Sequence, residues 1–525
     1  MDASSQDGKK KEYVTVHRVQ AWFLGRSRDN WKQKYKKVKA HAKRLQNRVN
    51  DVTRSRESWR RQVEELKAEN AALREQAALK KTDHAIARTS MSPMQSLCDD
   101  RPISIHGYGA GIACLYLRLV LVANVSLRGA SRVIKTVSDA LGLELPVPHW
   151  TTGRQWLLRV GHSVLVAEKT VADDWAWIID HSVQIGQDKC LVILGIRLCD
   201  LPERGQSLRH EDMELIALIT ARSWTRAQVD AALQATAEHV GHVPRAIITD
   251  QGPDLSGGIA LFQRRHPNAV HIHDAKHKAA CLLKARLEKN PRWLEFQTRV
   301  AQTRCSVQQT EMAFLTPSAP KPKARFMNLG QQLIWGKRVL AIVRKRPEIV
   351  RQSVTAKRLK EKLGWIEAFA DDLTEWSQWQ QVVDVSVTLV NCQGIYRGVS
   401  RLLTQQVSQL DAVDASGRQL AAELVKFVRG QERLARPKER FPGSTEVLES
   451  CFGKFKQLEK QQSRGGFTQL LLGFGSLLAK IVPETVREAL QASGAADVRA
   501  WAAQHLGATV FAQRKMAYAS ATENG

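Results

Sequence analysis

Two aspartates directly follow short apolar runs, a placement that can bring carboxylates together. Asp180 follows residues 175–179, and Asp250 follows residues 246–249. A short apolar run is typical of a buried strand, although an aspartate in this place can also cap a helix. Converging carboxylate oxygens are the ligands that Mg²⁺ prefers. Two such ions about 4 Å apart can activate a nucleophile and stabilise a leaving oxygen in phosphoryl transfer, so both aspartates are candidate metal ligands.

A third carboxylate is expected from a helix further along the chain, which Ser444 or Thr445 can cap. Glu449 is the favoured ligand on this helix, and Lys456 lies near the same face because the two residues are seven apart. Glu446 is the competing ligand. Its alternative role is to compensate the helix dipole, because it stands one turn earlier.

The elements around the two aspartates follow the order strand, strand, strand, helix, strand, helix, strand. The strands and the first helix are expected at residues 175–180, 190–198, 214–220, 246–250 and 269–274 and at residues 226–240. This is the element order of the RNase H fold, in which the first and fourth strands lie side by side. Asp180 and Asp250 would then converge, which favours a catalytic role for both.

Three motifs carry a resemblance to a known family. They are I-I-D ending at Asp180, I-T-D-Q-G around Asp250 and V-L-E-S-x-F-G-K-x-K around Glu449. Together they resemble the DDE transposases of bacterial insertion sequences, over about residues 175–480. The resemblance implies that the three carboxylates form a catalytic triad that binds two Mg²⁺ ions, with Mn²⁺ as a substitute. It also implies Mg²⁺-dependent strand cleavage and strand transfer, with transposon ends and target DNA as partners.

The distance between Asp250 and Glu449 is too long for a bare RNase H-like core. Residues 290–440 have a largely helical pattern with a Pro/Lys-rich break at 316–325, which predicts an all-α insertion domain. The insertion divides the α/β core into residues 166–289 and 441–482. The tryptophans of the insertion are Trp335, Trp365, Trp376 and Trp379. They are expected mainly in its core. The resemblance offers an alternative role, in which one of them stacks on a flipped base.

An apolar repeat of 3.5 residues runs from Trp31 to Ala77. It predicts a left-handed coiled coil over residues 27–82 and a homodimer; the alternative is a long helix lying on the protein body. Asn70 falls on the seam, where a buried asparagine favours a parallel dimer. Residues 1–26 are expected to form a basic tail, and residues 483–525 a C-terminal helical tail.

Residues 83–165 are predicted to hold a linker and a helix-turn-helix-like DNA-binding region. One helix is expected to start at Ser126 and a second at Thr151, with turn formers between them. Arg154 and Gln155 would then be exposed toward a major groove; a plain helical hairpin is the alternative. The other candidates for contact with DNA are Lys454, Lys456 and His277.

A cluster of possible metal ligands spans residues 271–281: His271, His273, Asp274, His277 and Cys281. A structural zinc ion is one interpretation of this cluster. We favour the other, in which Asp274 and His277 lie at a strand end beside the active site. There they would contact DNA or the groups that hydrogen-bond to the metal ligands and orient them.

The composition favours a polyanionic partner. The 525 residues carry a formal net charge of +27, which suits nucleic acid, although a merely basic or ribosome-associated protein is the alternative. The eight cysteines form no Cys-x-x-Cys pair, which argues against a disulfide framework and favours a reducing cytoplasm. The resemblance implies a bacterial cytoplasm and association with the nucleoid. No apolar stretch has the roughly 20 residues that a membrane span needs.

Two other functions compete with the transposase hypothesis. A catalytically silent DNA-binding relic is disfavoured by the intact triad. An RNase H-like nuclease or resolvase is disfavoured by the coiled coil and by the 199 residues from Asp250 to Glu449.

Overall fold

The computed structural model describes residues 107–523 except 186–187, 319–325, 327–328, 411–412, 462–467 and 509, together with Ile103 and isolated residues between positions 25 and 46. The chain divides into two units, Met1–Ser92 and Pro93–Gly525. Nearly all of the predicted basic tail, coiled coil and linker lies outside the described residues. The coiled coil and the dimer therefore stay predictions, and the description below concerns the second unit.

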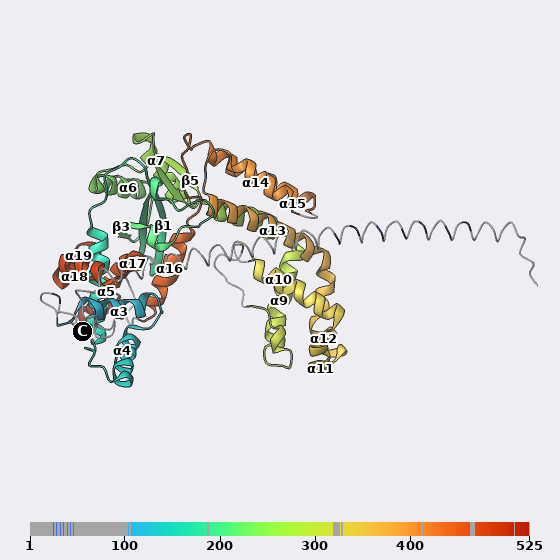
Figure 1. Cartoon of the computed structure of the whole chain (residues 1–525), viewed down its shortest axis with the longest axis horizontal. Helices are drawn as coiled ribbons and strands as arrows, with labels where there is room; N and C mark the ends of the chain where they lie inside the picture. The colour runs from blue at the N-terminus through green and yellow to red at the C-terminus, as the bar shows by residue number, and fades with distance from the viewer. Residues whose placement is uncertain are drawn as a thin grey trace, which may run out of the picture. The chain divides into compact units, whose positions relative to one another are not determined.

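A mixed sheet of five strands lies at the centre of the described α/β region, in the order β3-β2-β1-β4-β5 (Figure 1). The strands are β1 (Trp175–Ile185), β2 (Asp188–Arg197), β3 (Glu214–Ala221), β4 (Ala246–Thr249) and β5 (Val270–His273). β1 is antiparallel to β2 and parallel to β4, while β2 and β3 are antiparallel and β4 and β5 are parallel. All five predicted strands are present, and the predicted adjacency of the first and fourth strands is confirmed.

The two faces of the sheet pack against different helices, and β1 alternates between them. One face is covered by α6 (Arg226–Val240) and α7 (Pro253–Arg265). The β1 side chains in that layer are Trp175, Trp177 and Ile179. Ala176 and Ile178 face the opposite layer. Because side chains two residues apart on a strand lie on the same face, the carboxylate of Asp180 lies on the same face of the sheet as Ala176 and Ile178.

The opposite layer contains helices from both ends of the second unit. They are α3 (Ala110–Leu121), α4 (Leu127–Leu141), α5 (Trp150–Val166), α16 (Glu446–Glu459), α17 (Gly473–Leu478), α18 (Pro483–Ala492) and α19 (Ala495–His505). α5 packs against α3, α4, α17, α18 and α19. At its crossing with α17 a Cβ on Gly161 would lie 1.7 Å from the carbonyl oxygen of Leu472, so only glycine fits. Residues 107–165 and 483–505 thus share one hydrophobic core.

The helix-turn-helix-like region differs from the prediction in two respects. α4 begins as expected, with the Ser126 hydroxyl accepting from the Gly129 N–H at 3.0 Å. α5, however, begins at Trp150, with His149 as its N-cap residue instead of a threonine. Arg154 and Gln155 are half-buried, and the expectation that both are exposed is wrong, because neighbouring helices surround α5.

The predicted helical insertion is confirmed in its secondary structure: the described part of residues 290–440 forms helices and no strand. Its helices are α9 (Pro291–Val307), α10 (Leu329–Lys345), α11 (Glu348–Ser353), α12 (Ala356–Leu363), α13 (Ala370–Gln393), α14 (Val399–Ser408) and α15 (Ala415–Glu432). They form a core with α8 (Ala275–Leu287). Trp376 and Trp379 are buried there, and Trp335 and Trp365 pack partly buried against it, as expected for core residues.

Short 3₁₀ helices and one further helix complete the described elements. They are η1 (Leu198–Asp200), η2 (His210–Asp212), η3 (Ala313–Leu315), η5 (Gly364–Phe369), η6 (Gln469–Leu472) and α20 (Val510–Glu523). Of the helices that the structure describes, none is long and apolar enough to cross a membrane.

A buried ion pair attaches the end of the insertion to the sheet. The Arg245 guanidinium, just before β4, donates to both carboxylate oxygens of Glu439 at 2.7 and 2.9 Å. Both side chains are almost fully buried, at 6% and 11% exposure. Arg245 also donates to the carbonyl oxygens of Asn268 and Leu434. The segment that leads into α16 is therefore held at the sheet.

Candidate metal centre

Asp180, on β1, and Asp250, directly after β4, occupy equivalent positions relative to these two parallel strands. β1 and β4 are in register at Ile178 and Ile248, and each aspartate stands two residues beyond this pair. Paired strands lie about 4.8 Å apart, and residues two apart share a face. Both carboxylates therefore emerge beside each other on the face of the sheet that Ile178 and Ile248 share.

Each aspartate is oriented by a neighbouring backbone N–H. The Asp180 Oδ1 accepts from the N–H of His181 at 2.7 Å, and the Asp250 Oδ1 accepts from the N–H of Gly252 at 2.9 Å. A Cβ at position 252 would lie 3.0 Å from the same Asp250 oxygen. Glycine in the Asp-Gln-Gly motif thus permits the tight turn that aims this carboxylate before α7 begins.

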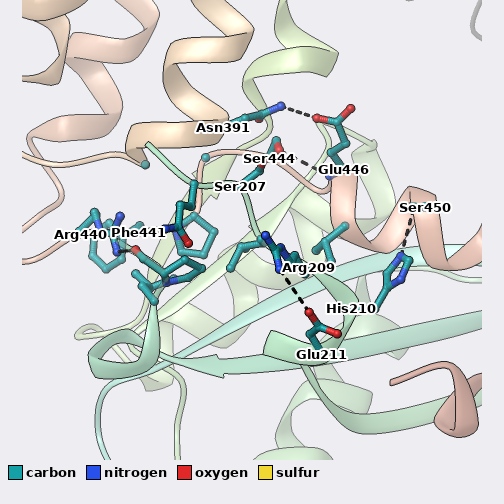
Figure 2. A pocket seen from close by; sticks show the side chains of 18 residues that line it. Ser207, Arg209, His210, Glu211, Asn391, Arg440, Phe441, Ser444, Glu446 and Ser450 are labelled. Atoms are coloured by element: carbon teal, nitrogen blue, oxygen red, sulfur yellow. Dashed lines mark hydrogen bonds and ion pairs between the residues drawn. The ribbon is translucent and has the colours of Figure 1, made fainter. Parts of the chain in front are cut away.

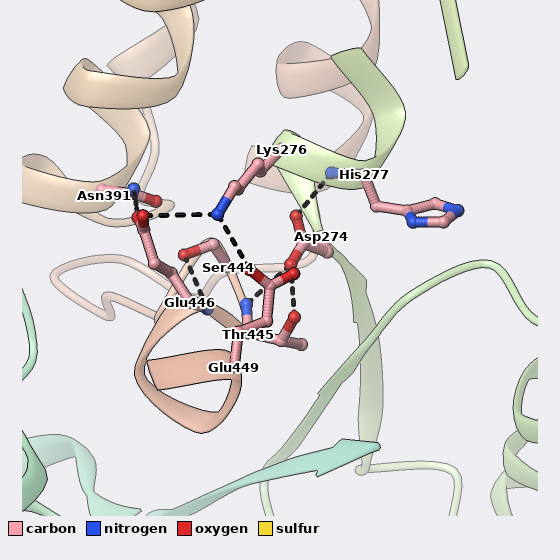
Figure 3. Close-up of polar contacts among 8 residues, drawn as sticks. All are labelled: Asp274, Lys276, His277, Asn391, Ser444, Thr445, Glu446 and Glu449. Carbon is pink, nitrogen blue, oxygen red and sulfur yellow. Dashed lines mark hydrogen bonds and ion pairs between the residues drawn. The ribbon is translucent and has the colours of Figure 1, made fainter. Parts of the chain in front are cut away.

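A buried carboxylate, Asp274, positions the helix that carries Glu449. Asp274 caps α8 through the N–H of His277 at 2.8 Å. Its second oxygen accepts from the N–H and the hydroxyl of Thr445, at 2.7 and 2.6 Å (Figure 3). Thr445 is the N-cap residue of α16, and α16 also packs on β1. Glu449, in the first turn of α16, is thereby held next to the ends of the parallel strands.

The electrostatics of Asp180 show that these carboxylates are close to one another. The pKa of Asp180 is raised to about 7. Burial is the largest cause, the negative charge of Asp250 comes next, and the charges of Glu449 and Asp274 make smaller contributions. Mutual repulsion of this kind is relieved when a cation binds between the groups. The charges of the other two predicted ligands, Asp250 and Glu449, thus both act on Asp180, whereas Glu446 is not among the charges that raise its pKa.

Lys276 compensates the charge of Glu449 in this structure. Its Nζ lies 2.8 Å from Glu449 and 3.3 Å from Glu446 (Figure 3). Burial lowers the pKa of Lys276, but the bonds and charges of the two glutamates outweigh it and leave the pKa raised. Within the described part of the chain, no three possible ligand side chains are gathered tightly enough to hold an ion. The oxygen donors suit Mg²⁺ in type, and Glu449 would have to leave Lys276 in order to bind an ion.

Glu446 lies further out than Glu449. Its side chain is half exposed and accepts a hydrogen bond from the amide of Asn391. Figure 2 shows Glu446 at the edge of a cavity of about 590 Å³, whose wall also includes Ser444 and Arg209. This placement favours Glu449 as the ligand.

The remaining predicted contacts with DNA differ in accessibility. Lys456 is exposed on α16. Lys454 is half-buried and donates to the His210 Nδ1 at 3.0 Å, while the His210 Nε2 lies 3.0 Å from the Ser450 hydroxyl. Burial lowers the pKa of His210, and the charge of Lys454 lowers it further. The His277 ring extends away from the Asp274 cluster (Figure 3). Lys456 is therefore the most accessible of the three.

The five-residue cluster at 271–281 is used for packing and capping. Both carboxylate oxygens of Asp274 accept hydrogen bonds from protein groups, which leaves them poorly suited to a zinc ion. The rings of His271 and His273 lie 4.0 Å apart. Burial and the neighbouring His273 lower the pKa of His271 to about 3. Asp274 does lie at the end of β5, and its charge acts on Asp180; an active site beside it stays a prediction.

Sequence reasoning missed Lys276. Its position two residues after a strand-ending aspartate was the available signal, but nothing in the spacing links it to residues 446–449. No model of a known protein family matches the chain, and no curated protein matches its sequence. The carboxylates of Asp180, Asp250 and Glu449 are thus candidate ligands for cations, and the amine of Lys276 lies beside Glu449.

Proposed function

We propose that the chain is a DNA transposase with an RNase H-like core, in which Asp180, Asp250 and Glu449 hold two Mg²⁺ ions. The observation that carries the proposal is that each aspartate stands two residues beyond the paired residues Ile178 and Ile248 of the parallel strands β1 and β4. The repulsion that Asp250 and Glu449 exert on Asp180 supports it. The strand order β3-β2-β1-β4-β5 is consistent with such a core, and the helical insertion accounts for the long segment before Glu449.

The bound cations supply the positive charge that a phosphoryl-transfer transition state needs. The three carboxylates position the ions, and the backbone N–H groups of His181 and Gly252 hold Asp180 and Asp250 in place. Lys276 now holds Glu449; if Glu449 held an ion instead, the amine of Lys276 would be available to contact a strand phosphate. Asp274 keeps α16 fixed in either case.

The proposed substrate is DNA: the ends of the mobile element and a target duplex, in a bacterial cytoplasm. The net charge of +27 supports a polyanionic partner. Lys456 is exposed on the helix that carries Glu449, so a phosphate near the ions would meet its charge. The coiled coil predicted for residues 27–82 would pair two chains, as the joining of two ends requires.

The test uses a labelled duplex that carries the inverted repeat flanking the gene. Asp180→Asn, Asp250→Asn and Glu449→Gln should each reduce Mg²⁺-dependent cleavage by on the order of 100-fold or more, while DNA affinity is kept. Glu446→Gln is the matched control and should retain substantial activity. Joined products with a target duplex separate a transposase from a nuclease or resolvase. Cleavage that survives in both aspartate variants would contradict the proposal.

A further inference from the structure

A second cavity, of about 1190 Å³, lies among the starts of α4 and α5, the 3₁₀ helix η6 and the end of α19. Its charged lining residues are Arg128, Arg154 and Arg499, and none of the described residues that line it is acidic. Asp180, Asp250 and Glu449 do not line it. The described lining of the cavity thus carries positive charge and no carboxylate, which suits an anionic ligand.

The walls of this cavity are held together by contacts between distant parts of the sequence. Arg159 of α5 donates to the carbonyl oxygens of Leu490 and Ser493, just before α19. The His162 Nδ1 lies 2.9 Å from the Ser493 hydroxyl. On the other side, the N–H of Leu127 donates to the Gln461 side chain at 2.9 Å. The site therefore exists before a ligand binds, which lowers the entropic cost of binding.

Two further features of the wall suit a nucleobase. The Arg128 guanidinium lies 4.9 Å from the ring centroid of Trp150, and unpaired bases stack on both aromatic rings and guanidinium planes. The Gln155 side-chain Oε1 is buried and has no hydrogen-bond partner. A glutamine amide offers a donor and an acceptor together and can pair with the edge of a base.

We propose that this cavity binds an unpaired nucleotide at the end of a DNA strand. Its base contacts Trp150, Arg128 and the Gln155 amide, and its phosphate pairs with Arg499. In an intact duplex the faces of the bases are covered by stacking, so an unpaired nucleotide is the form that presents a base face and phosphates together. The inference rests on the proposed function in one respect, that DNA is the partner.

The experiment compares two labelled duplexes, one blunt and one with three unpaired 3′ nucleotides. The affinity of the full chain for each is measured by fluorescence anisotropy in EDTA, so that no cleavage occurs. The parent chain should bind the overhang duplex about tenfold more tightly, the ratio expected from stacking one base. Trp150→Ala and Arg499→Ala should each remove most of this preference, and Trp150→Phe should keep it, because a phenyl ring still stacks.

The matched control is Arg264→Ala, which removes an exposed arginine from α7. It should lower the affinity for both probes equally and leave their ratio unchanged. Equal affinity of the parent chain for the two probes would overturn the inference, as would a preference that survives both alanine variants. Thymidine monophosphate is the competitor: tight binding of it without any overhang preference would assign the cavity to free nucleotides and overturn the strand-end proposal.

The outcomes separate this inference from the proposed function. If the parent chain shows no overhang preference, only the cavity proposal is contradicted, and the proposal of Mg²⁺-dependent cleavage stands. Absence of cleavage, with the preference intact, contradicts the transposase proposal alone. If neither duplex binds, both proposals fail.

Discussion

The carboxylate of Asp274 accepts two hydrogen bonds from Thr445, although 171 residues separate them. The same carboxylate caps α8, so it fixes the helix that carries Glu449 to the end of β5. Asp274→Ala leaves the buried donors of Thr445 and His277 without a partner. We expect it to lower the free energy of unfolding by about 3 kcal/mol and to reduce Mg²⁺-dependent cleavage. Denaturant titration and the cleavage assay measure the two effects.

Substitutions at Thr445 provide the control for this prediction. Thr445→Val removes the hydroxyl donor and should cost about 1 kcal/mol, whereas Thr445→Ser keeps the hydroxyl and should restore most of the stability. Equal stability of the two variants would show that the hydroxyl bond contributes nothing.

The raised pKa of Asp180 predicts a pH dependence of stability in the metal-free chain. Its folded pKa of about 7 lies above its ordinary value of 3.8, because of burial and then the charge of Asp250. Its contribution to stability is complete below the ordinary value and is lost as the pH rises through about 7. In EDTA, Asp180→Asn should therefore be more stable than the parent at about pH 8. The gap should shrink toward about pH 4, at about 1.4 kcal/mol per unit of pKa shift.

Thermal unfolding of both chains across this pH range measures the effect. Asp139→Asn, which changes an exposed carboxylate on α4, should follow the profile of the parent chain. A constant difference between Asp180→Asn and the parent at all pH values would refute the electrostatic account of the cluster.

The Arg245–Glu439 pair should contribute far more to stability than a surface pair. Glu439→Gln leaves a buried guanidinium without its counter-charge, and breaking such a pair costs about 3–5 kcal/mol. The exposed pair of Lys135 and Asp139 is the comparison, and Asp139→Ala should cost at most about 1 kcal/mol. Chemical denaturation of the two variants gives both values. A cost for Glu439→Gln as small as that for Asp139→Ala would mean that the insertion is not held at this point.

The predicted coiled coil requires the full chain to be a dimer. A chain that begins at Pro93, the boundary between the two units, should be monomeric at micromolar concentration. In the full chain, Asn70→Leu should raise thermal stability while loosening the choice of oligomer, because a buried asparagine specifies a dimer at a cost in stability. Sedimentation velocity measures the oligomeric state. A monomeric full chain would show that residues 27–82 do not self-associate.

The sheet and both aspartates could be predicted because their signals are local. An apolar run that ends in Asp180 or Asp250 carries its own evidence for a strand and for the side chain at its end. The order of the elements then supplied the adjacency of the two strands. The position of Glu449 could not be predicted in the same way. Its helix is identifiable from the sequence, but the place of that helix beside the strands depends on a contact with Asp274, which is distant in the sequence.

The full burial of α5 could not be predicted, because three of its partner helices, α17, α18 and α19, lie more than 300 residues further along the chain. Arg159 contacts Leu490 and Ser493, and spacing along the chain gives no information about such pairs. An arginine and a glutamine near the start of a helix suit an exposed surface equally well, so Arg154 and Gln155 were assigned to the wrong environment. Lys276 was missed for the same reason, since its partners Glu446 and Glu449 are 170 and 173 residues away.

The hydrogen bonds between Asp274 and Thr445 have a consequence for how this protein can evolve. They bring the two ends of the intervening segment to one point, so the segment leaves and rejoins the sheet region at the same place. Insertions and deletions are tolerated where chain ends already meet and the core is undisturbed. The helices whose buried residues lie only in the core of the insertion, α9 to α12, can therefore be gained, lost or exchanged as a cassette without moving the carboxylates of Asp180 and Asp250.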